Sequence, residues 1–117
     1  LLIDEFIKTG IDGVCIDTSE LAMLMLGIDP KDHNVAHLYD EVDPSVLVAA
    51  AYVITAAQKH KITSTLSGLA PSLYPSLLDK AVTWGVTAVT ISPDVIDSTR
   101  QHLRLFERKL VASRGKK

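Results

Sequence analysis

Short apolar segments alternate with longer amphipathic segments along this chain. Residues 14–16, 62–66 and 88–91 are rich in β-branched and other apolar side chains, as buried strands are, and the segments between them carry apolar residues at helical spacing. Strands that alternate with helices form parallel sheets. The pattern therefore predicts an α/β fold with about three parallel strands and covering helices.

The N-terminal half contains three predicted helices. The first covers the opening residues, and the second runs to residue 26, with Thr18 or Ser19 as its N-cap because a hydroxyl accepts a hydrogen bond from a free amide. The third spans residues 44–61 and starts with a proline, which suits the first turn of a helix. Residues 28–42 show little periodicity and are predicted to form a surface excursion that includes a turn of helix.

The C-terminal half repeats the strand-helix pattern. A helix is predicted from Pro71 or Ser72 to Trp84, after a tight loop that follows the second strand. A final helix is predicted to start within residues 92–94 and to run to about residue 112.

Composition fits one domain that covers residues 1–117. Of these residues, 47% are hydrophobic and 22% are charged, as in one ordinary globular domain. The opening residues lack an initiator methionine and already have the pattern of an amphipathic helix. We therefore expect the sequence to be a segment of a longer protein.

Charge and cysteine content exclude several function classes. The net charge of -2 provides no basic field for nucleic acid, and only residues 114–117 form a basic cluster. Cys15 is the one cysteine, so an intrachain disulfide is impossible and a cytoplasmic protein is expected. The apolar stretches are far shorter than the ~20 residues of a membrane-spanning helix, so no membrane role is expected.

Candidate chemistry lies where the predicted strands end. In parallel sheets, functional side chains gather at the carboxyl ends of the strands. Here those ends fall at residues 17–20, 67–72 and 92–94.

Two of these strand ends have alternative interpretations. Glu20, with Asp17 nearby, suits either a magnesium site or the start of a helix, where a carboxylate interacts favourably with the helix dipole. Ser67 and Gly68 suit either a cradle for a phosphate or carboxylate or an ordinary turn between strand and helix. The residue pattern leaves both alternatives open.

Other candidates lie away from the strand ends. His33 and His37 are four residues apart and can share a helix face as metal ligands, or they are solvated surface histidines. Cys15 stands between two apolar strand residues, which predicts a small core side chain rather than a nucleophile.

Three arginines recur at helical spacing in the last predicted helix. Arg100, Arg104 and Arg108 follow one another at intervals of four and suit either a grip on an acidic partner or a solvated outer face.

Three segments resemble a known family. Residues 10–21 read G-I-D-G-V-C-I-D-T-S-E-L and look like the run G-I-D-G-V-S-I-G-S-N-D-L of phosphoenolpyruvate synthase and pyruvate phosphate dikinase. Residues 35–44 resemble the family's V-A-H-L-F-D-E-R-x-P, and residues 68–75 resemble the end of its C-G-Q-A-P-S-D-Y-P. The resemblance covers nearly the whole chain in order, and it points to the C-terminal phosphoenolpyruvate/pyruvate-binding barrel of that family.

The resemblance implies a partial (β/α)8 TIM barrel and a set of site residues. A complete barrel takes ~250 residues, so this chain supplies about three of the eight units. In the family, the Asp of S-N-D-L holds magnesium, its Asn contacts substrate, and the Cys of C-G-Q-A-P donates a proton. The resemblance therefore assigns Glu20 to the metal, Ser19 to the substrate and Ser67 to the proton-donor position, and the cradle interpretation adds Gly68 as a substrate-binding residue.

Departures from the family fall at chemical positions. The Ser67 hydroxyl is a far weaker acid than a thiol, whose ordinary pKa is about 8.5. Met23, Leu69 and Leu73 replace polar residues of the family. The resemblance implies a phosphotransferase-family segment that binds a phosphoenolpyruvate or pyruvate-type anion with Mg²⁺ and is catalytically incomplete or degenerate alone.

An assembly role is the alternative to ligand binding. Unpaired edges of a parallel sheet invite association with further strands. We therefore expect either a homo-oligomer or docking to the rest of the barrel, and the alternative function is a non-catalytic structural module derived from that barrel.

Overall fold

The computed structural model describes residues 2–115. The strands are β1 (Gly13–Asp17), β2 (Thr63–Ser67) and β3 (Ala88–Val89). The α-helices are α1 (Ile3–Lys8), α2 (Thr18–Leu26), α3 (Pro44–Lys59), α4 (Ala70–Leu73), α5 (Pro75–Trp84) and α6 (Ile96–Arg114). Two short 3-10 helices, η1 (Ala36–Leu38) and η2 (Pro93–Val95), lie in the connections.

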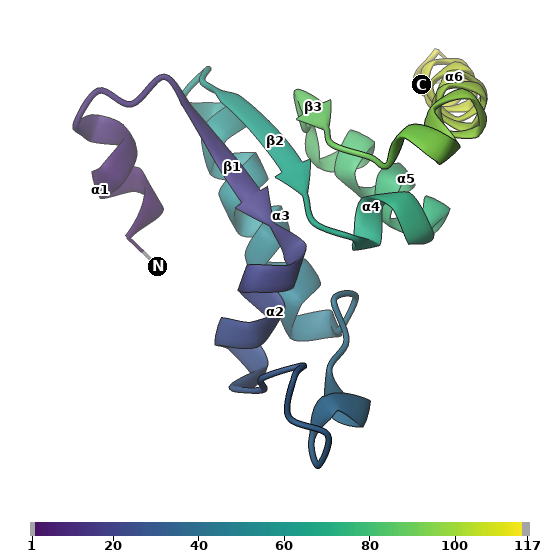
Figure 1. Cartoon of the computed structure of the whole chain (residues 1–117). Coiled ribbons are helices and arrows are strands. Elements are labelled where there is room, and N and C mark those ends of the chain that lie inside the picture. The colour runs from purple at the N-terminus through teal and green to yellow at the C-terminus, as the bar shows by residue number, and fades with distance from the viewer. Residues whose placement is uncertain (1, 116–117) are drawn as a thin grey trace.

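The strands form one parallel sheet in the order β1-β2-β3, which confirms the predicted three-stranded parallel sheet (Figure 1). β1 and β2 pair over five residues each, whereas β3 pairs with β2 through two residues only. The prediction of a strand over residues 88–91 was therefore too long. The Thr90 amide still donates to the Leu66 carbonyl at 2.8 Å. The Ser92 amide, however, donates to Ser72 Oγ at 2.8 Å instead of to the sheet, and the chain then enters η2.

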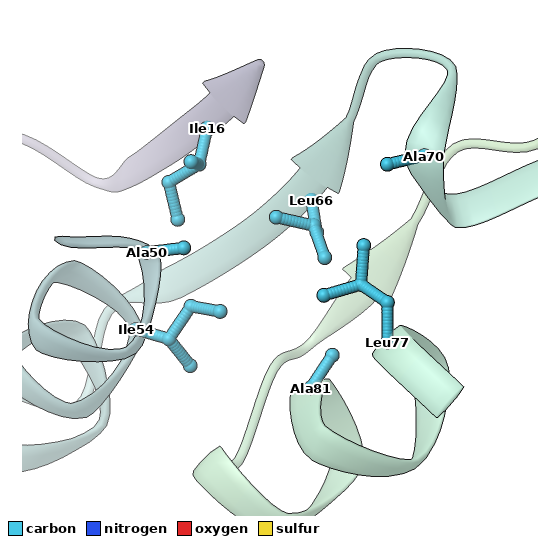
Figure 2. Close-up of a cluster of buried hydrophobic side chains, with 7 residues drawn as sticks. All are labelled: Ile16, Ala50, Ile54, Leu66, Ala70, Leu77 and Ala81. Atoms are coloured by element: carbon cyan, nitrogen blue, oxygen red, sulfur yellow. The ribbon is translucent and has the colours of Figure 1, made fainter. Parts of the chain in front are cut away.

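One face of the sheet carries the hydrophobic core. Ile16 of β1 and Leu66 of β2 point toward α3 and α5, as Figure 2 shows. Alternate residues of a strand point to opposite faces, so the same strands place Cys15, Thr65 and Ser67 on the other side. The core cluster consists of Ile16, Ala50, Ile54, Leu66, Ala70, Leu77 and Ala81.

The second face of the sheet is open. Cys15 is exposed, and so are Gly13 and Thr63 beside it. The prediction that Cys15 is a core residue was wrong, because its side chain lies on the face opposite to α3 and α5. The Cα radius of gyration is 15.3 Å, compared with about 13 Å for a compact chain of this length, which agrees with an open arrangement.

Two helix boundaries also differ from prediction. The helix expected over residues 71–84 is divided into α4 and α5, because Tyr74 is extended, with φ -121° and ψ 94°, as a residue that precedes proline tends to be. α3 ends at Lys59, two residues earlier than predicted, and Lys61 then adopts a left-handed φ of 59°.

Histidine-aspartate pairs fix the outer helices. His60 Nε2 lies 2.7 Å from Asp4 Oδ1 and joins α3 to α1, and this hydrogen bond lowers the pKa of Asp4. His102 Nε2 lies 2.7 Å from Asp79 Oδ1 and joins α6 to α5. Within residues 2–115, no helix is long and apolar enough to cross a membrane.

Candidate functional site

The carboxyl ends of β1 and β2 lie side by side. Asp17 pairs with Ser67 in the sheet register, so the connections that leave the two strands start at neighbouring points. Ser19 and Glu20 lie in the first turn of α2, which follows β1 directly, and Gly68 follows Ser67 in the loop between β2 and α4. All four candidate site residues therefore lie where two neighbouring strands end (Figure 1).

Asp17 starts α2. Its Oδ1 accepts from the amides of Ser19 at 2.9 Å and Glu20 at 3.2 Å, which makes it the N-cap of this helix. The prediction that Thr18 or Ser19 is the N-cap was wrong. Both hydroxyls have another partner, and that partner is Glu41.

The carboxylate of Glu41 is the centre of the site. Its side chain comes from the excursion before α3, and only 8% of the residue is exposed. Thr18 Oγ1 lies 2.5 Å from Glu41 Oε2, and Ser19 Oγ donates to Oε1 at 3.0 Å. The amide of Ala70 donates to Oε2 at 3.0 Å. One buried carboxylate thus joins the excursion, the start of α2 and the start of α4.

Tyr39 completes this network from the same excursion. Its hydroxyl lies 3.3 Å from Glu41 Oε1 and 3.1 Å from the Ser19 carbonyl oxygen. Burial, followed by the negative charge of Glu41, raises the pKa of the Tyr39 phenol. Tyr39 therefore stays protonated and serves as a hydrogen-bond donor. Hydrogen bonds compensate the buried charge of Glu41, because no cation forms an ion pair with it within residues 2–115.

Gly68 permits the loop after β2 to lie close to the start of α2. It has a φ of 100°, which favours glycine, and a Cβ atom there would overlap Thr18 Oγ1 and lie 2.9 Å from the Thr18 amide nitrogen. The glycine at this position is therefore explained by packing against the start of α2, whether or not a ligand binds nearby.

Ser67 is held inside the sheet edge. Its Oγ donates to the Ile16 carbonyl at 3.3 Å and lies 3.4 Å from Cys15 Sγ. Cys15, whose thiol is exposed, is thus a neighbour of the position where the resemblance expects an acidic thiol. The sequence alone did not suggest this proximity, because 52 residues separate the two side chains.

The anion cradle predicted at the start of α4 is partly occupied by the protein itself. The Ala70 amide donates to Glu41, so it is not free for a ligand. The amides of Gly68 and Leu69 make no hydrogen bond within the part of the chain that the structure describes. Two free donors therefore remain at the end of β2.

The predicted histidine cluster does not form. His33 and His37 are exposed, and the segment that holds them consists of turns and the short η1, so four-residue spacing does not bring them to one helix face. Among residues 2–115, no three histidine, cysteine, aspartate or glutamate side chains are arranged to hold a metal ion.

Comparison with known proteins assigns this arrangement to a family. The family described as PEP-utilising enzyme, PEP-binding domain matches residues 1–108. The chain belongs to this family. The resemblance stated from the sequence motifs is therefore confirmed.

The similar relatives are phosphoenolpyruvate synthases. The probable phosphoenolpyruvate synthase of Archaeoglobus fulgidus is 32% identical over 117 residues, which is 100% of this chain and 15% of that protein. The phosphoenolpyruvate synthase of Aeropyrum pernix is 32% identical over 115 residues, 97% of this chain and 14% of the relative. That of Pyrococcus furiosus is 34% identical over 110 residues, 94% and 13% respectively. The chain thus spans about one seventh of these PEP-utilising relatives.

Glu41 is the residue that sequence reasoning overlooked. It lies in the segment Val35 to Glu41 that carries part of the family resemblance, and also within residues 28–42, which are predicted to form a surface excursion. Its neighbours Leu38 and Asp40 are exposed, so no periodic pattern distinguishes its burial. The available signal was the motif itself, because the family's V-A-H-L-F-D-E also has a glutamate at the position of Glu41.

Proposed function

We propose that this chain is the C-terminal segment of a phosphoenolpyruvate synthase-like protein and forms three strand-helix units of its phosphoenolpyruvate/pyruvate-binding barrel. The open face of the sheet is the observation that carries this proposal. Parallel sheets are buried on both faces, and here helices cover only one. The remaining strands of a barrel would cover the face of Cys15, Thr65 and Ser67 and pair with the free edges of β1 and β3.

The proposed ligand is a phosphoenolpyruvate or pyruvate-type anion at the carboxyl ends of β1 and β2. The unpaired amides of Gly68 and Leu69 are donors for its carboxylate or phosphate oxygens. Ser19 can join them if its hydroxyl exchanges the bond to Glu41 for one to the ligand. Thus the chain contributes one wall of the site, and the rest of the barrel supplies the others.

The residues present fit a magnesium ion that is shared with the ligand. Mg²⁺ in proteins is usually held by one or two carboxylates, with water and substrate phosphate as its other ligands. Glu20 is exposed beside this site, and Asp17 uses only Oδ1 to cap α2. A Mg²⁺ ion on these two carboxylates would neutralise negative charge on the ligand oxygens.

Catalysis by the chain alone is not part of the proposal. Ser67 already donates its hydroxyl proton to the Ile16 carbonyl, and an unassisted hydroxyl is a poor acid. Leu69 and Leu73, with 61% and 65% of their surface exposed, place apolar side chains where the family has polar contacts. We propose a binding segment that is catalytically incomplete without the rest of the barrel.

Calorimetric titration of phosphoenolpyruvate tests this function. With Mg²⁺ present, we expect weak binding that disappears in Glu20→Ala and is unchanged in the control Asp32→Asn, whose carboxylate lies in the excursion. We expect no turnover of pyruvate and ATP by the chain. Absence of Mg²⁺-dependent binding in the wild-type chain would overturn the proposed ligand site.

The same open face favours a second candidate function. A non-catalytic module that self-associates through the free edges of β1 and β3 would also cover this face. Hydrogen bonds and apolar contacts between strands are not weakened by a high salt concentration, unlike contacts between charges. A discrete oligomer at about 0.5 M NaCl, together with no phosphoenolpyruvate binding, would support this alternative.

A further inference from the structure

The outer face of α6 carries a row of three arginines. Arg100, Arg104 and Arg108 are exposed and lie at intervals of four residues, about 6 Å apart along the helix. With Asp97, Gln101 and Leu105 they line one shallow hollow on the helix surface. None of the three arginines forms an ion pair within residues 2–115. We call this surface the arginine face.

Helix stability does not account for the arginine face. Like charges four residues apart destabilise a helix by about 0.2–0.5 kcal/mol per pair. Basic residues are favourable in the last turn of a helix, but all three arginines lie before the last turn of α6, which ends at Arg114. The Leu105 side chain, 52% exposed among them, adds an apolar contact surface. These features are typical of a surface that contacts an acidic partner.

The excursion of residues 28–42 carries three exposed aspartates and one exposed lysine, Lys31. The aspartates are Asp29, Asp32 and Asp40. Each uses Oδ1 to accept a backbone amide two residues later, at 2.9, 3.0 and 2.9 Å respectively. None forms an ion pair within the described residues, and Leu38 beside them is 57% exposed. We call this surface the acidic excursion.

The two surfaces cannot meet within one copy. Figure 1 shows α6 and the acidic excursion at opposite ends of the molecule. α6 is fixed on α5 by the pair of His102 and Asp79, and the excursion is fixed on the sheet end through Glu41 and Tyr39. Their charge complementarity is also reflected in the sequence, because residues 1–95 hold 12 of the 14 acidic residues and residues 96–117 hold 7 of the 12 basic ones.

We propose that the arginine face of one copy docks against the acidic excursion of a second copy. Arginine pairs well with carboxylates, and each aspartate keeps one oxygen free for this contact. Leu105 and Leu38 would lie within the same interface. The contact joins two different surfaces, so it is a head-to-tail association. It uses neither the open sheet face nor the proposed ligand site, and its failure would leave the proposed function unaffected.

Sedimentation velocity in low and high salt tests the contact. The wild-type chain should associate at about 50 mM NaCl and do so at least about tenfold more weakly at about 500 mM, where the Debye length falls from about 14 to about 4 Å. The triple variant Arg100→Glu, Arg104→Glu, Arg108→Glu should be monomeric at both concentrations. A wild-type monomer at low salt, or a triple variant that still associates, would overturn the proposal.

Two further variants make the test specific. Asp29→Asn, Asp32→Asn, Asp40→Asn removes the charge but keeps the oxygen acceptor of each turn, and it should also be monomeric. Because each triple variant retains the surface that the other has lost, their mixture should form a one-to-one complex. Absence of this complex would overturn the proposal.

The control variant carries the same change in net charge at other places. Lys59→Glu, Lys61→Glu, Lys80→Glu alters exposed lysines outside α6 and outside the acidic excursion and should associate as the wild type does. Circular dichroism checks that every variant is folded. Loss of association in this control would show a general charge effect and overturn the docking contact.

Discussion

The two faces of the sheet differ in composition and in burial. On the covered face, Leu66 is 0% exposed and Ile16 is 7% exposed, and both pack on apolar residues of α3 and α5. On the open face, the neighbouring strand residues are Cys15, Thr65 and Ser67, which are small and mostly polar. The covered face supplies the stability of the segment, and the open face is available to other strands and to ligands.

This difference separates the side chains that hold the fold together from those at the strand ends. Packing of α3 and α5 on the sheet requires the apolar side chains of one face only. Ser67, at the end of β2, is not a member of the core cluster. Changes at such a position can therefore leave the fold intact.

A large-to-small substitution on the covered face should have the largest effect. Leu66→Ala removes a fully buried side chain and should lower the free energy of unfolding by about 2–5 kcal/mol, as measured by urea denaturation. Thr65→Ala, one residue earlier on the open face, should change it by no more than about 1 kcal/mol. Equal losses in the two variants would contradict the division into a covered and an open face.

Removal of the buried Glu41 carboxylate should have the second-largest effect on the free energy of unfolding. Glu41→Ala leaves the Ala70 amide without its acceptor and removes the carboxylate that the Thr18 and Ser19 hydroxyls contact, which should cost about 2–3 kcal/mol. Glu41→Gln keeps an acceptor oxygen and should cost less. The control Asp40→Asn should stay within about 0.5 kcal/mol of the wild type. Urea denaturation measures all three, and a neutral Glu41→Ala would refute the central role of this carboxylate.

The substitution Gly68→Ala should test the contact between the loop after β2 and the start of α2. Gly10 and Gly68 both have positive φ, but a Cβ at Gly10 meets nothing within 4 Å, whereas one at Gly68 meets the Thr18 backbone. Gly68→Ala should therefore lower stability by at least about 1 kcal/mol more than Gly10→Ala. Thermal denaturation of the pair gives the difference. Similar denaturation midpoints for the two variants would argue against close packing of Gly68 on Thr18.

The N-cap of α3 should give the smallest effect, and it depends on pH. Hydrogen bonds from the Ser45 hydroxyl and amide lower the pKa of Asp43 below its ordinary value of 3.8. Because the folded-state pKa is lowered, the stabilisation is complete above 3.8 and is lost as the pH falls through the folded-state pKa.

Asp43→Asn keeps a neutral acceptor at this cap and does not titrate. The wild type should therefore have the higher urea midpoint at about pH 6.5, and the difference should diminish at about pH 3. A difference that stays constant with pH would exclude Asp43 as its source.

Sequence periodicity predicted the covered face well. The three strands and the helices α2, α3 and α6 were located from apolar spacing, because burial on one side imposes such spacing. The break at Tyr74 had a local signal, since Pro75 disfavours a helical conformation in the residue before it. That signal was overlooked within an otherwise helical pattern.

The candidate site was predicted only in part. The family resemblance and the predicted anion cradle located Ser19, Glu20, Ser67 and Gly68 at two strand ends, and the sheet register then brought these ends together. The role of Glu41 depends on contacts across 22 to 29 residues of chain, which no local pattern reports. The exposure of Cys15 likewise depends on which face the helices cover, and an apolar strand sequence does not determine this.

Cys15 provides a built-in probe of assembly. It is the one cysteine in 117 residues, and its thiol is exposed on the open face. A maleimide footprint at this atom reports whether further strands lie over that face, in the chain alone or within a longer protein. A reactive thiol in the isolated chain and a shielded one after assembly would map the burial of this face without any mutation.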